Sequence, residues 1–219
     1  MNLMDIRYKL LREIRRFRYP QIAYWHDRFD QYGARAVLDL RHSENEMLAL
    51  TTRQKNQIFP YVSEYLTGQE EIALDYGCGH GRFSMALAEL IGGKTIAVDP
   101  VSGFLDIAPK SKQVNYRHLK RSKLPLENAS VDLVWVCLVL GGISNKNLPS
   151  TIAELRRVMK PNAIVCLIEN TSDLRSNRYW NYRSVAFYQE LFSFCNLQHL
   201  SDYEDLKETN SILIGRSKE

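Results

Sequence analysis

The sequence predicts an α/β protein in which helices cover both faces of a mostly parallel, seven-stranded sheet, a doubly wound arrangement. Short apolar runs alternate along the chain with segments whose apolar residues recur at helical spacing. The last two apolar runs, 197–203 and 210–215, are joined by a connection too short for a crossover. We therefore expect the final strand to be antiparallel to its neighbour.

The first 68 residues are expected to form a helical extension, followed by the sheet domain over 69–219. Residues 1–18 show helical spacing and hold six basic residues against two acidic ones, which equals the net charge of +4. We expect this helix to pack on its own domain with solvated arginines, and a helix that touches a membrane surface or an acidic partner is the alternative. Residues 21–50 are rich in aromatics, and a further helix is expected over 51–66.

The stretch 72–83, IALDYGCGHGRF, predicts a strand, a glycine turn and the start of a helix. Glycines allow positive φ and let a ligand approach the backbone closely. The helix start adds unpaired N–H groups. A dinucleotide fingerprint would place a third glycine at position 82, where this chain has Arg82, so an NAD-linked oxidoreductase is disfavoured.

The pattern Asp-x-Gly-x-Gly-x-Gly over 75–81 resembles motif I of the class I S-adenosylmethionine-dependent methyltransferases. Later blocks follow in the order of that family's core: a strand over 94–98 that ends in Asp99, a strand over 131–140, and a helix before a strand over 163–168. The resemblance covers residues 70 to 216. It implies a Rossmann-like sheet, S-adenosyl-L-methionine as cofactor, S-adenosyl-L-homocysteine as product, and N-terminal helices that act as a lid.

The resemblance also implies a cofactor site at the carboxyl ends of the strands. Asp99, 22 residues after Gly77, is expected to accept hydrogen bonds from the ribose hydroxyls, with an ordinary turn acid as the alternative. Asp75 is expected to orient the amino group, or merely to cap the turn. Many relatives carry an aspartate at the position of Lys120, so adenine is expected to be held by backbone N–H groups and apolar contacts. The expected cofactor residues are Asp75, Gly77, Cys78, Gly79, Asp99, Pro100, Val101, Lys120, Arg121 and Leu138.

The catalytic and acceptor residues are less sharply defined. Methyl transfer needs alignment of acceptor and methyl carbon, and a base only if the nucleophile must lose a proton. Many relatives have histidine after the fourth strand, where this chain has Gly141 and Gly142. We expect His42 to be the candidate base, with a packing histidine as the alternative. The expected acceptor residues are Glu169, Arg175, Tyr179 and Trp180, although an aromatic helix over 179–192 that packs on the sheet would also explain them.

These features favour a methyltransferase that acts on an oxygen or nitrogen of a small metabolite. Methylation of a protein or RNA, and cofactor binding without turnover, are the alternatives. Outside residues 1–18 the chain is nearly neutral, so nucleic acid is not expected as a partner, and no metal site is expected. Four scattered cysteines, no transmembrane run and no signal-peptide pattern predict a cytoplasmic protein with free thiols.

Overall fold

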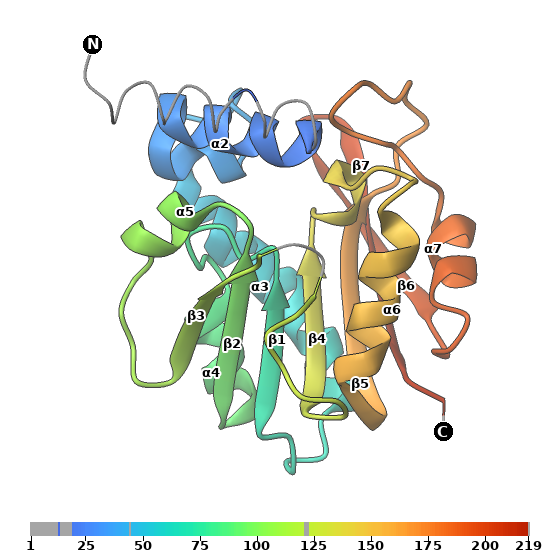
Figure 1. The fold of residues 1–219 in the computed structure, drawn as a ribbon. Coiled ribbons are helices and arrows are strands. Elements are labelled where there is room, and N and C mark those ends of the chain that lie inside the picture. The colour runs from blue at the N-terminus through green and yellow to red at the C-terminus, as the bar shows by residue number, and fades with distance from the viewer. Residues whose placement is uncertain (1–12, 14–18, 44, 121–122, 219) are drawn as a thin grey trace.

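The computed structural model describes residues 13, 19–43, 45–120 and 123–218 (Figure 1). The basic helix expected over residues 1–18 therefore lies outside the described part, apart from Glu13. The central sheet has the strand order β3-β2-β1-β4-β5-β7-β6. Its strands are β1 Ile72–Tyr76, β2 Lys94–Asp99, β3 Val114–His118, β4 Val131–Cys137, β5 Met159–Asn170, β6 Gln198–Asp205 and β7 Glu208–Arg216.

The strand directions confirm the predicted fold class. Strands β1 to β5 pair in parallel, whereas β7 is antiparallel to both β5 and β6. The last strand in the sequence is thus inserted between β5 and β6, and it is the reversed one. The short β6–β7 connection requires this, because parallel neighbours need a crossover of a dozen or more residues.

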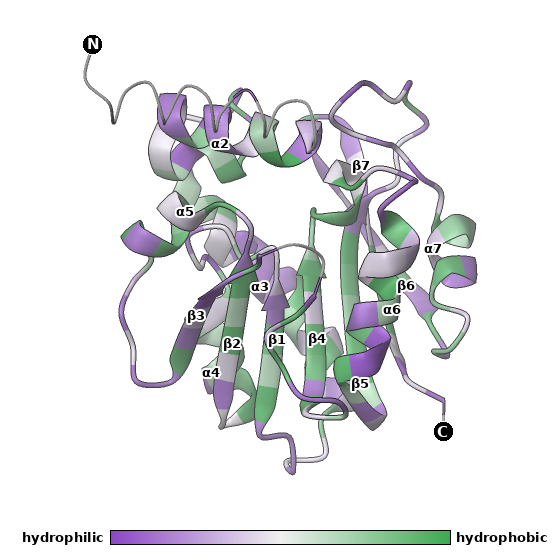
Figure 2. Cartoon of the chain, viewed as in Figure 1, coloured by the Kyte–Doolittle hydropathy of each residue, from purple (hydrophilic) through white to green (hydrophobic). Residues whose placement is uncertain are grey.

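Helices cover both faces of the sheet, and the central strands beneath them consist largely of hydrophobic residues (Figure 2). One hydrophobic layer lies under α6 and α7, and the other lies under α3 and α4. The fully buried Trp135 of β4 packs against Phe59 and Phe83, which lie in the second layer or at its edge. The described helices are α2 Pro20–Tyr32, η1 Gly33–Val37, α3 Glu46–Tyr65, α4 Ser84–Ile91, α5 Ser102–Ile107, η2 Leu140–Gly142, α6 Leu148–Val158 and α7 Val185–Leu191.

Several elements differ from their predicted bounds, for example α3, which begins at Glu46 rather than at 51, and β5, which begins at Met159 rather than at 163. β4 was expected to run to residue 140 but ends at Cys137, because Leu138 adopts a left-handed φ of 57° and η2 follows. The helix expected over 179–192 begins only at Val185. The segment before it is held by tertiary contacts instead, since the Asn181 N–H donates to the Gly141 carbonyl at 2.8 Å.

Helix α2 lies across the carboxyl ends of the strands, apart from the helices that flank the sheet (Figure 1). It packs on α5 through Phe29, whose ring meets that of Phe104 edge-on at 4.9 Å. The Arg28 side chain donates to the carbonyls of Ala36 and Leu38 and so fixes α2 to η1. This arrangement places α2 over the sheet edge where ligands bind in open α/β folds.

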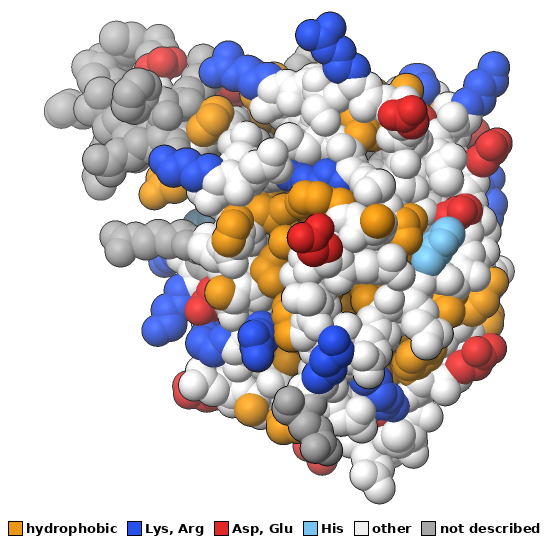
Figure 3. Space-filling view, turned by 90° about the vertical axis from the view of Figure 1, so that its right-hand side faces the viewer, with side chains coloured by type: hydrophobic (Ala, Val, Ile, Leu, Met, Phe, Trp, Pro, Cys, Tyr) orange, Lys and Arg blue, Asp and Glu red, His pale blue; other side chains and the backbone are white. Residues whose placement is uncertain are grey.

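The surface that carries α7 has a mixed character. Figure 3 shows a patch of hydrophobic side chains in the middle of the face turned toward the viewer, with basic side chains above and below it and acidic ones among them. This face therefore lacks the concentration of positive charge that a nucleic-acid surface would have. Within the described residues, no helix is both long and apolar enough to cross a membrane.

Candidate active site

A cavity of about 390 Å³ lies at the carboxyl ends of β1, β2 and β4, a size typical of small-ligand sites. The glycine turn after β1 forms its floor, together with the ends of β2 and β4. Gln21, Ile22 and Trp25 of α2 line it from above. The chain therefore encloses the sheet edge between a rigid βα turn and a covering helix.

The glycine turn requires glycine for two reasons. Gly77 and Gly79 have φ values of 73° and 55°, which side chains other than glycine rarely adopt. A Cβ on Gly77 would lie 2.5 Å from Val139, and a Cβ on Gly79 would lie 2.6 Å from Val37. The side chains of Val139, which follows β4, and of Val37 in η1 thus flank the turn closely. Residues without a side chain are needed at positions 77 and 79 for the turn to fit between them.

Asp99 connects the end of β2 to this turn. Its carboxylate accepts hydrogen bonds from the N–H groups of Gly79 at 2.9 Å and Val101 at 2.8 Å. Burial raises the pKa of Asp99 to about 6, against the lowering effect of these two bonds. Each carboxylate oxygen retains capacity for a further hydrogen bond, so Asp99 can accept from hydroxyls of a ligand in the cavity.

Asp75 and Leu138 lie at the ends of the two central strands. The Ser84 hydroxyl donates to the Asp75 carboxylate at 2.6 Å, and burial raises the pKa of Asp75 to about 7. Leu138 is held in its left-handed conformation by an N–H bond to the Ile168 carbonyl at 2.7 Å. Such strained residues concentrate at binding sites, and Leu138 lines the cavity.

The structure brings most of the expected cofactor residues together. Eight of the ten line the cavity, namely Asp75, Gly77, Cys78, Gly79, Asp99, Pro100, Val101 and Leu138. Lys120 is exposed and does not line it, and Arg121 lies outside the described residues. Sequence reasoning missed Arg82 and the α2 residues Gln21, Ile22 and Trp25. The many aromatic residues within 21–50 indicated that this segment covers the ligand site, but they did not indicate which of its side chains face the cavity.

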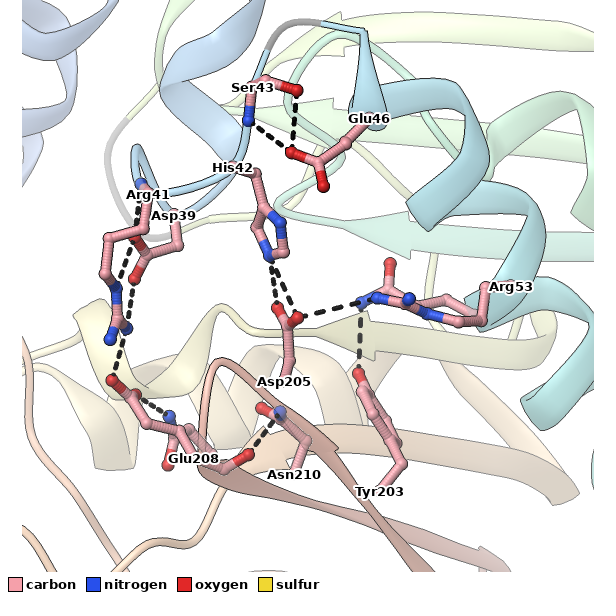
Figure 4. A network of polar contacts seen from close by, with 12 residues as sticks. Asp39, Arg41, His42, Ser43, Glu46, Arg53, Tyr203, Asp205, Glu208 and Asn210 are labelled. Carbon is pink, nitrogen blue, oxygen red and sulfur yellow. Dashed lines mark hydrogen bonds and ion pairs between the residues drawn. The ribbon is translucent and has the colours of Figure 1, made fainter.

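His42, the expected base, lies away from the cavity wall. It is 8% exposed, and its Nε2 is 3.0 Å from each carboxylate oxygen of Asp205 (Figure 4). Beside it, the Arg41 guanidinium pairs with Asp39 and with Glu208, each at 2.7 Å. These contacts fasten the segment between η1 and α3 to the β6–β7 turn, and His42 is not among the residues that line the cavity, so its role as a base stays a prediction.

The four expected acceptor residues also lie outside the cavity lining. Glu169 is fully buried, and it accepts N–H bonds from Val139 at 2.9 Å and Leu140 at 2.7 Å. Burial raises its pKa to about 7. Arg175 is exposed. The Tyr179 ring stacks on Tyr24 of α2 at 4.4 Å, and Trp180 covers Gly141, where a Cβ would lie 2.5 Å from its ring.

Comparison with known proteins agrees with this geometry. Residues 73–162 match the family profile described as "Methyltransferase domain". The chain is 28% identical over 160 residues to a demethylmenaquinone methyltransferase of Oceanobacillus iheyensis, covering 68% of this chain and 65% of that protein. It is 35% identical over 97 residues to a malonyl-[acyl-carrier protein] O-methyltransferase of Serratia marcescens, covering 43% and 36%. Residues 73–162 are thus a methyltransferase domain of the class I, S-adenosylmethionine-dependent type.

A crystal structure of a methyltransferase from Methanosarcina mazei, titled SAM-dependent, shares the fold. The TM-score is 0.62 at 17% identity, and the match covers 73% of this chain and 97% of that one. The present chain spans less than two thirds of the length of either curated relative. Within the methyltransferase fold, the cavity occupies the expected edge of the sheet. Among the described residues, no group of three His, Cys, Asp or Glu side chains could hold a metal ion.

Proposed function

We propose that this chain transfers a methyl group from S-adenosyl-L-methionine to an oxygen or nitrogen of a small metabolite. The observation that carries the proposal is the cavity in which the glycine turn, Asp99 and Leu138 meet beneath α2. The names of the relatives support methylation of metabolites, and two of them name the atom, as a malonyl-[acyl-carrier protein] O-methyltransferase and an N-demethylindolmycin N-methyltransferase. The enclosed volume suits a cofactor with a small acceptor better than a macromolecular segment.

The residues of the cavity fit this cofactor. Asp99 would accept from the ribose hydroxyls, and the Gly77 and Gly79 backbone would lie against the methionyl part. The apolar side chains of Val101, Phe104 and Leu119 line the cavity where adenine would lie, consistent with recognition that does not use the exposed Lys120. When bound, S-adenosyl-L-methionine supplies the activated methyl group on its sulfonium.

We propose that no side chain of the cavity acts as a general base. Among the described residues that line it there is no His, Lys or Glu, and its two acids are Asp75 and Asp99. Both already accept hydrogen bonds from the protein. The acceptor would then be a neutral amine or an oxygen already ionised in solution, since neither must lose a proton before attack. The protein contributes alignment and exclusion of water, with Trp25 and Ile22 as the cover.

We also propose that residues 1–68 act as the lid and that the protein works in the reducing cytoplasm. The position of α2 above the cavity supports the first proposal. All four cysteines are free thiols, which supports the second. Contact of the basic segment 1–18 with a membrane surface stays a prediction, because that segment lies outside the described residues.

Calorimetric titration with S-adenosyl-L-homocysteine and with NAD tests the cofactor. Binding of NAD but not of S-adenosyl-L-homocysteine would contradict the proposal. Transfer of a labelled methyl group to separate pools of phenols, carboxylic acids and amines then tests the acceptor. Label found only in added RNA or protein would exclude a small metabolite as acceptor.

A further inference from the structure

Residues 138–143, which follow β4, form one wall of the cavity, and we call them the post-β4 wall. Four of them line the cavity, namely Leu138, Val139, Gly142 and Ile143. The side chain of Val139 also packs on the glycine turn, where a Cβ on Gly77 would lie 2.5 Å from it. The position of this wall therefore sets the width of the cavity above the turn.

The Glu169 carboxylate holds the post-β4 wall from the side that faces away from the cavity. Its Oε1 accepts the Val139 N–H at 2.9 Å and the Leu140 N–H at 2.7 Å, and its Oε2 accepts the Gly141 N–H at 3.2 Å. Glu169 is fully buried near the end of β5, so a central strand fixes its position. A neutral amide has a single acceptor oxygen and could not serve all three donors.

The carbonyl groups of the post-β4 wall are held by the segment that precedes α7. The Arg183 guanidinium donates to the Leu140 carbonyl at 2.7 Å and to the Ile143 carbonyl at 2.8 Å. The backbone N–H of Asn181 donates to the Gly141 carbonyl at 2.8 Å. The wall is thus held through both its N–H groups and its carbonyl groups, while several of its side chains face the cavity.

Glu169 and Arg183 carry opposite charges but meet only through this backbone. Both are buried, and among the described residues they form no ion pair with each other. Burial raises the pKa of Glu169 to about 7, although its three N–H bonds and the charge of Arg183 lower it. Burial of two charges that are not directly paired is costly. What the structure gains from them is a single defined position of the wall.

The post-β4 wall and the expected ribose acid lie on opposite sides of β1. Asp99 ends β2, whereas the wall follows β4, and the strand order places β1 between these two strands. A shift of the wall would therefore leave the contacts of Asp99 in place. It would change how an acceptor is aligned with the methyl group, and a misplacement of about 1 Å can cost about 100-fold in rate.

We propose that Glu169 is a positioning residue for the methyl-transfer step, which holds the post-β4 wall where an acceptor is aligned with the methyl group. Arg183 shares this role from the carbonyl side. In this role Glu169 acts through the wall and does not touch the acceptor. The inference rests on the proposed function, because it assumes that methyl transfer takes place in this cavity.

The test uses Glu169→Gln in the full chain, because glutamine keeps the size of the side chain and places an NH₂ group against one of the three N–H groups. The first measurement is the initial rate of labelled methyl transfer from saturating S-adenosyl-L-methionine to pools of phenols, carboxylic acids and amines. We expect this rate to fall by about 10- to 100-fold. The calorimetric Kd of S-adenosyl-L-homocysteine should change by less than about threefold, because the bonds of Asp99 remain. The second measurement is amide hydrogen exchange, which should become faster at residues 139–141.

Glu70→Gln is the matched control. Glu70 is 9% exposed and also accepts backbone N–H groups, from Thr67 at 3.1 Å and from Gly68 at 3.0 Å. It precedes β1 at the opposite edge of the sheet and does not line the cavity. This variant should lose stability in urea, yet it should transfer methyl groups at the unaltered rate. The comparison separates positioning from a general loss of stability.

Arg183→Lys tests the same wall from its carbonyl side. Lysine keeps the charge, but a single ammonium group replaces the planar fork that reaches two carbonyl groups. The rate should again fall more than the affinity for S-adenosyl-L-homocysteine. If Glu169→Gln does not fold, an Arg183→Lys protein with the full rate would refute the inference.

Two results with Glu169→Gln would overturn the inference. The first is an unchanged rate together with unchanged exchange at residues 139–141. The second is a loss of affinity for S-adenosyl-L-homocysteine as large as the loss of rate, which would show that Glu169 only supports the fold of the cavity. If the unaltered protein methylates none of the pools, the proposed function is contradicted instead, and the exchange at residues 139–141 then decides whether Glu169 holds the wall.

Discussion

Replacing Asp99 with asparagine tests the centre of the site with little change in shape. In the protein, one carboxylate oxygen accepts the Gly79 N–H and the other accepts the Val101 N–H. An amide offers a single acceptor oxygen, so one of these two N–H groups would face an NH₂ group. The amide also carries no charge to strengthen hydrogen bonds from the ribose.

The magnitudes separate the effect on binding from the effect on folding. Loss of charge-assisted bonds to the ribose should weaken S-adenosyl-L-homocysteine by about 1.5–3 kcal/mol, or about 10- to 150-fold in Kd. One unsatisfied N–H costs about 1–3 kcal/mol of stability. The pKa of Asp99 is raised from 3.8 to about 6, so keeping its buried charge costs about 3 kcal/mol well above that pH. Asparagine removes this cost of the buried charge. In the free energy of unfolding, that gain nearly offsets the loss caused by the unsatisfied N–H group.

The sign of the pH dependence follows from the same shift. The folded protein binds the Asp99 proton more tightly than the unfolded chain does, because the folded-state pKa is the higher one. This contribution to stability is fully present below the unfolded pKa of 3.8 and is lost as the pH rises through about 6. The asparagine variant should lack it, and urea unfolding at several pH values measures the difference.

Calorimetry near neutral pH measures the affinity, and circular dichroism confirms the fold. Asp106→Asn is the control, because Asp106 is exposed on α5 and its loss changes the net charge equally. An Asp99→Asn protein that is folded and binds S-adenosyl-L-homocysteine as tightly as the unaltered protein would refute the ribose assignment.

Three further predictions concern the same cavity. Gly79→Val should abolish cofactor binding in a folded protein, because its φ of 55° is strained for valine and its side chain would strike Val37; normal calorimetric affinity would contradict this. Affinity for S-adenosyl-L-homocysteine should fall as the pH drops below about 6, where Asp99 gains a proton, and a flat profile would count against that role. Deleting residues 1–43 should eliminate methyl transfer while deleting 1–18 should preserve cofactor binding, as assays of both folded proteins would show.

The sheet and the glycine turn could be predicted because their signals are local. The residues that line the turn and the ends of β1 and β2 are close together in the sequence, so the motif fixes their relative places. The expected ribose acid Asp99 lines the cavity for this reason. The reversed direction of β7 was also predictable, since it depends on the length of a single connection.

The contacts made by the N-terminal segment that covers the cavity, and by the segment around Trp180, could not be predicted in the same way. His42 was predicted to be a catalytic base. Its hydrogen-bond partner Asp205 lies 163 positions later in the sequence, and no local sequence pattern predicts that contact. The aromatic segment around Trp180 suggested a helix, but it packs on Gly141 in an irregular conformation. Tertiary contacts outweighed local propensity at both places.

The contacts of His42 have a consequence for the order in which the protein assembles. The segment that follows η1 is fastened by Asp205 and Glu208, which flank a turn whose Leu206 and Lys207 both adopt left-handed φ values. These residues are synthesised about 165 positions after the segment that they hold. The segment between η1 and α3 is therefore fastened only once the β6–β7 hairpin has formed, long after the glycine turn has been synthesised.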